Sequence, residues 1–179
     1  MLKPYLPVLL VLLAVLSPIQ GASFPSTEAK TIGGNDFQFP TDALKNGVAL
    51  FAIAMGTSRE NGEVQQQQLL AWQEYLDAAD SPLREFPLYH FPIIEAPGFI
   101  HGVIRRGIAK SYEGSVLPDR AAVIFIKDTK RFSQQSSIPI DDAATMTVVL
   151  PDGTISGFVK GAPTRQSLSR LEHLAGIRP

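Results

Sequence analysis

The sequence predicts a single α/β domain, in which a mixed sheet of four to five strands has helices packed on both faces. Residues 48–55 are almost all apolar and lie between two glycines, a pattern typical of a strand buried on both faces. Strand-like and helix-like segments alternate after that run. Near the end of the chain, Pro-Asp-Gly-Thr at 151–154 separates two apolar runs, as the turn of a β-hairpin does.

The first helix is expected over residues 63–79, directly after the strand at 48–55. Its apolar residues recur at spacings of three and four and form one buried stripe, made of Leu69, Trp72, Leu76 and Ala79. Asn61 is the expected N-cap residue. The glutamines at 65–68 are assigned to a solvated face of this helix.

The second strand is expected over residues 86–94. Pro87 and Pro92 lack the N–H that a strand ladder needs, so the strand is expected either to lie toward an edge of the sheet or to have a limited paired length. His90 is expected to be half-exposed. A helix over 97–113 follows, with an apolar residue at every fourth position: Ile100, Ile104, Ile108 and Tyr112.

The remainder reads as a strand at 121–126, a short helix at 131–135 and the hairpin strands 145–150 and 155–160. Thr164 is expected to cap the last helix, whose inner side carries Leu168, Leu171 and Leu174. Residues 23–46 mix Gly and Pro with polar residues, which indicates an extended lead-in with little regular structure. Phe37 and Phe39 alternate there and suit a short edge strand.

Residues 1–22 are typical of a signal peptide. Lys3 supplies one positive charge, and the apolar run at 7–16 is shorter than the ~20 residues that span a bilayer. Small residues at 21–23 suit a signal peptidase. The protein is therefore expected to be periplasmic or secreted, and an uncleaved membrane anchor is the alternative. Membrane contact is expected only in that second case.

Composition excludes several classes of protein. The 179 residues contain no cysteine, which excludes disulfides, thiol catalysis, thiolate metal sites and a lipid-modified cysteine. The net charge is −1, so there is no basic surface to attract nucleic acid. His90, Glu95 and His101 have suitable side chains for a metal but match no compact ligand spacing. No metal and no cofactor are expected.

The order of elements resembles the thioredoxin-like fold, over roughly residues 48–176. The ending VVLPDGTISGFVKGAPTRQSLSRL at 148–171 is similar to that of redoxins, and the strand at 121–126 with its short helix resembles the insertion of redoxins and peroxiredoxins. Residues 123–155 also resemble the redoxin-like assembly factor of mitochondrial ATP synthase. There an apolar strand is followed by Asp, a basic residue with Phe (Arg131-Phe132), a loop and an apolar strand.

Two departures from that family concern its chemistry. The resemblance implies a reactive cysteine after the first core strand, where this chain has Gly-Thr-Ser-Arg-Glu-Asn-Gly at 56–62. It also implies a cis-proline that contacts substrate before the strand at 147–150, where this chain has Ala-Ala-Thr-Met at 143–146. A serine hydroxyl at a helix N-terminus needs a general base beside it to act as a nucleophile. The sequence therefore predicts a redox-inactive relative.

The expected function is protein binding, by an envelope assembly factor or chaperone whose partner is a protein of the cell envelope. The candidate binding residues follow from where loops gather in this fold: Gly56, Thr57, Ser58, Arg59, Glu60, His101, Arg105 and Thr145. The turn at 92–99 belongs to the same surface. The alternative is a cysteine-independent enzyme or small-ligand binder at the same end of the sheet, which a pocket lined by Thr57, Arg59 and His101 would favour.

Overall fold

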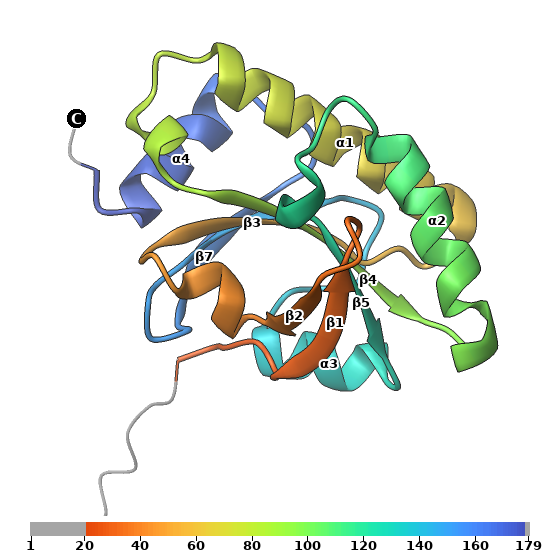
Figure 1. Ribbon diagram of the computed structural model, residues 1–179. Helices are drawn as coiled ribbons and strands as arrows, with labels where there is room; N and C mark the ends of the chain where they lie inside the picture. Colours follow the sequence, from red (N-terminus) through yellow and green to blue (C-terminus); the bar gives the residue numbers. More distant parts are fainter. Residues whose placement is uncertain (1–20, 178–179) are drawn as a thin grey trace, which may run out of the picture.

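The computed structural model describes residues 21–177, which form one seven-stranded sheet in the order β2-β1-β5-β4-β3-β6-β7 (Figure 1). The strands are β1 (Thr27–Thr31), β2 (Asp36–Phe39), β3 (Ala49–Ala54), β4 (Leu88–Glu95), β5 (Ala122–Ile126), β6 (Thr145–Val149) and β7 (Ile155–Lys160). The α-helices are α1 (Arg59–Ala78), α2 (His101–Tyr112), α3 (Thr129–Ser136) and α4 (Arg165–Leu174). Short 3₁₀ helices are η1 (Thr41–Leu44), η2 (Pro82–Glu85), η3 (Gly98–Ile100) and η4 (Pro118–Arg120).

The prediction of four to five strands was too low, because the lead-in at 23–46 supplies two more. β1 pairs antiparallel with both β2 and β5, so its polar sequence is held by neighbours on either side. Phe37 and Phe39 of β2 face inward, as their alternation predicted, and are buried with Phe24. These rings pack against Phe51 and Phe91, with centroids of Phe39 and Phe91 4.8 Å apart. Aromatic burial therefore makes the lead-in part of the fold.

Of the two alternatives for β4, the edge position was wrong, and a limited paired length is what the structure has on the β5 side. β4 is the middle strand and pairs parallel with β3 on one side and β5 on the other. Pro87 precedes the strand, and Pro92 keeps its register with Ala54 of β3. Pairing with β5 is interrupted between the His90–Ala121 bridge and the Ile93–Ile124 pair. The missing N–H of Pro92 thus leaves a local gap in one ladder of a central strand.

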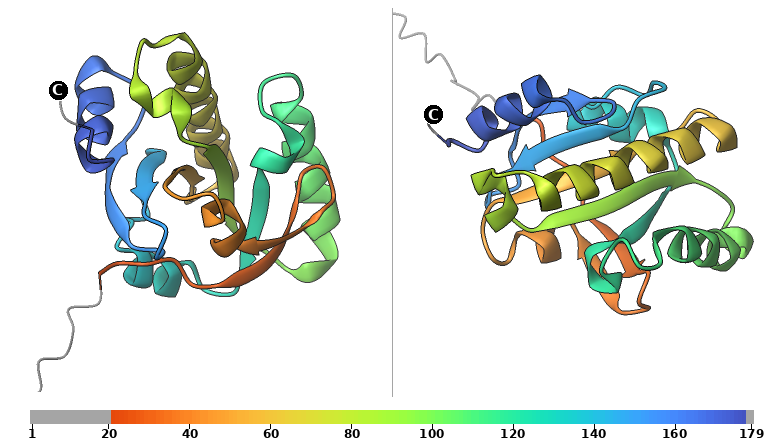
Figure 2. Two further views of the ribbon diagram at one scale, coloured as in Figure 1. Left: turned by 60° about the vertical axis from the view of Figure 1, so that its left-hand side comes forward. Right: turned by 90° about the horizontal axis from the view of Figure 1, so that it is seen from above.

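Helices cover the sheet on both faces, as Figures 1 and 2 show: α1, α2 and α4 lie on one side, and α3 lies on the other. Alternate residues of β3 enter the two cores, with Phe51 and Ile53 toward α3 and Leu50 and Ala52 toward α1. His90 points to the α1 and α2 side and is fully buried, so the expectation of half-exposure was wrong. Helices on both faces leave the central strands without a solvent-exposed side.

Several element boundaries differ from those expected. α1 begins at Arg59 with Ser58 as its N-cap, four residues before the predicted start, and Asn61 lies inside its first turn. The region predicted as one helix over 97–113 is the 3₁₀ turn η3 followed by α2, and only Tyr112 of its four-residue series is fully buried. The hairpin and the Thr164-capped α4 are confirmed. Within residues 21–177, no helix has both the length and the apolar character to cross a bilayer.

Candidate functional site

The loop from β3 to α1 is a tight turn. Gly56 lies so close to the start of the helix that a Cβ atom there would meet the Gly62 nitrogen at 2.7 Å. Ser58 Oγ accepts a hydrogen bond from the Asn61 N–H at 3.1 Å. The Asn61 side-chain oxygen accepts from the Thr57 N–H at 3.0 Å. The loop at 56–62 is therefore held by its own residues in one conformation.

The N-terminus of α1 already carries negative charge. Hydrogen bonds from the Glu60 backbone N–H and from Ser58 lower the pKa of the Glu60 carboxyl. Arg59 forms an ion pair with Glu63 at 2.9 Å, on the exposed surface of the first turns. Carboxylates are favourable at this end of a helix, and here they occupy the place of an external anion. The loop is not arranged as an anion site.

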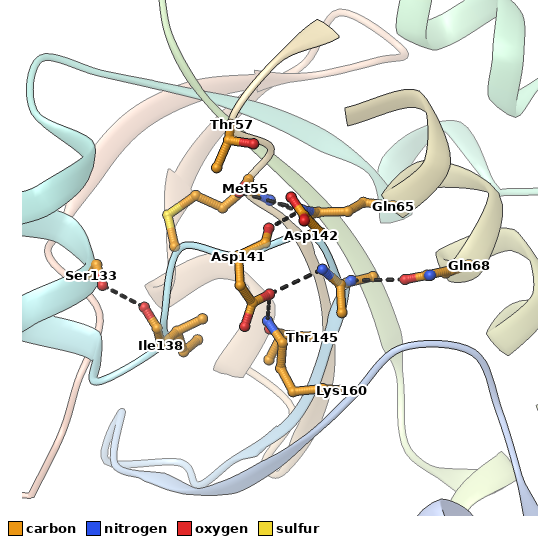
Figure 3. Close-up of polar contacts among 12 residues, drawn as sticks. Met55, Thr57, Gln65, Gln68, Ser133, Ile138, Asp141, Asp142, Thr145 and Lys160 are labelled. Atoms are coloured by element: carbon orange, nitrogen blue, oxygen red, sulfur yellow. Dashed lines mark hydrogen bonds and ion pairs between the residues drawn. The ribbon is translucent and has the colours of Figure 1, made fainter. Parts of the chain in front are cut away.

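Gln65 joins this loop to the segment before β6 (Figure 3). Its side chain is buried, and its Oε1 accepts a hydrogen bond from the Met55 N–H at 2.8 Å. Its Nε2 donates to the carbonyl oxygen of Asp141 at 2.7 Å and to the side-chain oxygen of Asn61 at 3.0 Å. One side chain thus fixes the end of β3, the start of α1 and the entry to β6.

Ala144 lies in the segment 143–146, where the resemblance implied a cis-proline. Its N–H donates to Gln68 Oε1 at 2.9 Å, and its carbonyl oxygen accepts from the Gly161 N–H at 2.8 Å. Both backbone groups are therefore satisfied inside the protein. Among residues 21–177 the one cis peptide bond is Phe39–Pro40, on the other side of the sheet from α1.

Asp141 and Lys160 form a partly buried ion pair beside Thr145. Lys160 Nζ lies 2.8 Å from Asp141 Oδ1 and donates to Thr145 Oγ1 at 2.8 Å. Partial burial works to raise the pKa of Asp141, but hydrogen bonds from Lys160 and from the Ala143 N–H outweigh it and lower that pKa. The pair closes the network that begins at Gln65.

The candidate residues fall into two groups. Thr57 to Glu60 remain exposed in the loop, and the buried Thr145 lies beside it through the Gln65, Asp141 and Lys160 contacts. His101 and Arg105 instead line a recess of about 620 Å³ with residues of β1, β2 and β5. There the His101 ring stacks on Phe125, with centroids 3.6 Å apart, and its Nε2 contacts the Ala96 carbonyl oxygen at 2.9 Å.

The sequence interpretation missed Gln65 and Gln68, because it placed residues 65–68 on a solvated face. Gln65 continues the buried stripe one turn earlier, since 65, 69, 72 and 76 follow the same four-three-four spacing. That spacing was the signal available for Gln65. Asp141 and Lys160 had no local signal, because their partners come from other elements.

The arrangement offers little for catalysis. Ser58 Oγ serves the helix cap, and the chain holds no cysteine. His90 contacts Gln73 and His101 contacts Ala96, so neither serves as a base for the loop. Within residues 21–177, no three His, Asp or Glu side chains are placed to hold a metal ion.

Protein-family models and curated protein sequences give no match to this chain. Solved structures match over most of its length. A putative electron transport protein from Aquifex aeolicus VF5 superposes with a TM-score of 0.58 at 14% identity, covering 87% of this chain and 98% of the other. BsSco, of the Sco family of cytochrome c oxidase assembly proteins, superposes with a TM-score of 0.55 at 12% identity, covering 89% of this chain and 96% of the other.

A reduced 2-Cys peroxiredoxin from Plasmodium vivax gives a TM-score of 0.51 at 16% identity, covering 88% of this chain and 93% of the other. The chain has the thioredoxin-like fold. At these identities the likeness concerns the fold, which is the one that the order of elements predicted. This thioredoxin-like chain lacks the active-site cysteine, because it contains no cysteine at all.

Proposed function

We propose that this thioredoxin-like protein acts by binding another protein through the loop end of its sheet, without thiol chemistry. The absence of cysteine, together with the hydrogen bonds that residues 56–62 make among themselves, supports a function without thiol chemistry. The alternative, a small-ligand site, called for a pocket lined by Thr57, Arg59 and His101. The recess that contains His101 includes neither Thr57 nor Arg59, so the alternative is less well supported.

The observation that carries the proposal is the exposure of Phe99. Its side chain is 87% exposed in η3, which follows the carboxyl end of β4. Val103 in the first turn of α2 is 61% exposed, and Val64 in the second turn of α1 is 48% exposed. Exposed apolar side chains grouped at one end of a domain mark interaction surfaces, and aromatic residues often dominate their binding energy.

A protein partner would contact side chains at the loop end, because the backbone groups of Ala144 already form hydrogen bonds inside the protein. Both backbone groups of Ala144 are bonded inside the protein, so no extended peptide can pair with them. Arg106, three positions after Val103 on α2, is exposed and supplies a polar group next to this apolar surface. An apolar centre with a polar rim is the usual composition of a protein interface.

The proposed role is that of an assembly factor or chaperone in the cell envelope. Two considerations support it: the predicted export signal at 1–22 and the structural likeness to BsSco, which is described as belonging to a family of cytochrome c oxidase assembly proteins. The similarity of residues 123–155 to the redoxin-like ATP synthase assembly factor agrees with the same role. The partner's chemistry is an apolar protein surface with mixed charge around it.

Affinity capture from an envelope fraction tests the proposal. The tagged wild type is compared with Phe99→Ser and with the control Leu117→Ser, which removes a side chain that is 70% exposed beside η4 at the opposite end of the sheet. We expect a partner that the wild type and Leu117→Ser retain and that Phe99→Ser loses. Equal recovery with both variants, or co-purification of a small molecule without a protein, would contradict the proposed function.

A further inference from the structure

A second region with binding character lies at the opposite end of the sheet from the loop at 56–62. A groove of about 720 Å³ is bounded by the C-terminal halves of α1 and α2, the starts of β3 and β4, and η4. Its wall is largely apolar, made of residues such as Leu50, Leu76, Leu83, Phe86 and Val116. The volume lies within the range of about 300–1,000 Å³ that is usual for small-molecule sites. None of the candidate residues of the loop end lines it.

Unpaired buried polar atoms gather around this groove. Within residues 21–177, three buried side-chain atoms have no hydrogen-bond partner: His90 Nδ1, the Tyr112 hydroxyl and Arg120 Nη1. Tyr112 and Arg120 line the groove, and His90 contacts Gln73, which also lines it. Buried polar groups are almost always paired, so the unpaired atoms of Tyr112 and Arg120, which both line the groove, indicate a missing polar partner.

The surroundings of His90 and Tyr112 determine whether their unpaired atoms act as donors or acceptors. Gln73 Nε2 donates to both oxygens of Asp77 at 3.1 Å, which leaves Gln73 Oε1 as the acceptor for His90 Nε2 at 3.1 Å. His90 is therefore protonated on Nε2, and its unpaired Nδ1 is an acceptor, so it is not one of the donors that a carboxylate would pair with. Burial raises the pKa of Tyr112, and hydrogen bonding by Gln66 works against that shift, although by geometry the Gln66 amide donates to Ser111 and not to the Tyr112 hydroxyl. The Tyr112 hydroxyl thus keeps its proton as a donor.

Arg120 contributes a positive charge without a counter-ion. Its guanidinium carbon lies 4.6 Å from the centre of the Tyr89 ring. Among the described residues no carboxylate lies within ion-pair distance of it, although four other basic side chains have such partners. An unpaired, partly buried cation is costly, and a carboxylate supplied from outside would satisfy both its charge and its free donor.

We propose that this groove binds a small amphipathic carboxylate, whose apolar body lies on the leucine-rich wall and whose carboxylate pairs with Arg120. The site is separate from the loop end, so it does not depend on the proposed protein binding. The apolar wall favours a hydrocarbon or aromatic body, and the unpaired donors select an acceptor head group. The groove opens to solvent at its rim, where Arg84 and Glu113 are exposed.

Isothermal titration of the purified protein with decanoate tests this site, with decan-1-ol as the uncharged probe of equal chain length. We expect saturable one-to-one binding of decanoate and at least tenfold weaker binding of decan-1-ol. Arg120→Gln is expected to weaken decanoate binding at least tenfold, while the control Arg106→Gln, on the outer surface of α2, leaves it unchanged. Circular dichroism confirms that each variant is folded.

A second variant separates loss of the site from loss of the fold. Ala109→Trp places a large side chain in the groove from a half-buried position on α2 and is expected to abolish decanoate binding without unfolding the protein. Absence of saturable binding to the wild type would overturn the proposal. Undiminished affinity in both Arg120→Gln and Ala109→Trp, or equal affinity for the alcohol, would overturn it as well.

Discussion

The side-chain amide of Gln65 donates a hydrogen bond to the carbonyl oxygen of Asp141 at 2.7 Å, across 76 positions of sequence. This contact joins the second turn of α1 to the segment that leads into β6. In the thioredoxin-like fold these two places flank the functional end of the sheet, where the resemblance implied a cysteine and a cis-proline. Here the same end is occupied by an internal polar network (Figure 3).

The first prediction concerns this network. Gln65→Leu keeps the approximate size of the side chain but leaves the Met55 N–H and the Asp141 carbonyl oxygen without their partner. Unsatisfied buried backbone groups cost about 1–3 kcal/mol each, so we expect the free energy of unfolding to fall by about 2–3 kcal/mol. Urea denaturation measures it. Gln67→Leu, at an exposed position of the same helix, is the control and is expected to change stability little.

The second prediction concerns acid stability. Burial lowers the pKa of His90 from 6.5 to about 4. Between those values the unfolded chain binds a proton that the folded protein does not, so the free energy of unfolding falls as the pH falls through this window. The loss is about 3 kcal/mol over the full window, at 1.36 kcal/mol for each pKa unit.

Urea denaturation between pH 7.5 and pH 4.5 checks this dependence. His90→Gln is expected to remove most of the loss of stability in that range, while His173→Gln, which changes an exposed histidine of α4, retains it. An identical pH profile for His90→Gln and the wild type would show that His90 is not responsible.

The third prediction concerns the turn between β3 and α1. In Gly56→Ala the new Cβ would lie 2.7 Å from the Gly62 nitrogen and 2.8 Å from its Cα, and neither backbone atom can move without shifting the helix. We expect a loss of about 2–3 kcal/mol, in the upper range for an overpacked site. Thermal denaturation provides the measurement.

Gly62→Ala is the matched control for this turn. A Cβ at Gly62 meets nothing within 4 Å, and the residue lies in the first turn of α1. Alanine is favoured over glycine in a helix by about 1 kcal/mol, so this variant is expected to be slightly more stable than the wild type. Destabilisation by both substitutions to the same extent would contradict the close approach at Gly56.

The fourth prediction concerns chemistry. The protein is expected to reduce neither insulin disulfides nor hydrogen peroxide above the level of a heat-denatured sample, because no thiol is present to form the mixed disulfide or to attack the peroxide. Turnover above that background would show that the loop end supports redox chemistry without cysteine, against the redox-inactive assignment.

The fold was predictable where local patterns carry it. The apolar run of β3, the Asp-Gly turn of the hairpin and the Thr164 cap each appear in the structure as the sequence predicted. An edge position was considered for β4 because Pro92 lacks an N–H. In the structure β4 is central, and the pairing with β5 is interrupted around Pro92. β1 was missed because TEAKT has no apolar alternation; its strand conformation depends on pairing with β2 and β5.

The site was predictable in part. The loop at 56–60 lies beside Thr145, because the order of strands fixes which loops meet at one end of the sheet. His101 and Arg105 lie in a different recess, since stacking of His101 on Phe125 turns the start of α2 toward β5 and β1. Contacts of this kind join residues far apart in the sequence and leave no local pattern, which is also true of the Asp141–Lys160 pair.

Site-specific photo-crosslinking tests the central claim most directly. A benzophenone amino acid replaces Phe99 in one variant and Leu117 in another, both at exposed positions at opposite ends of the sheet. Irradiation of cells that express each variant is predicted to give a discrete protein adduct at position 99 and none at position 117. An adduct at 117 without one at 99 would contradict a protein-binding surface at the loop end.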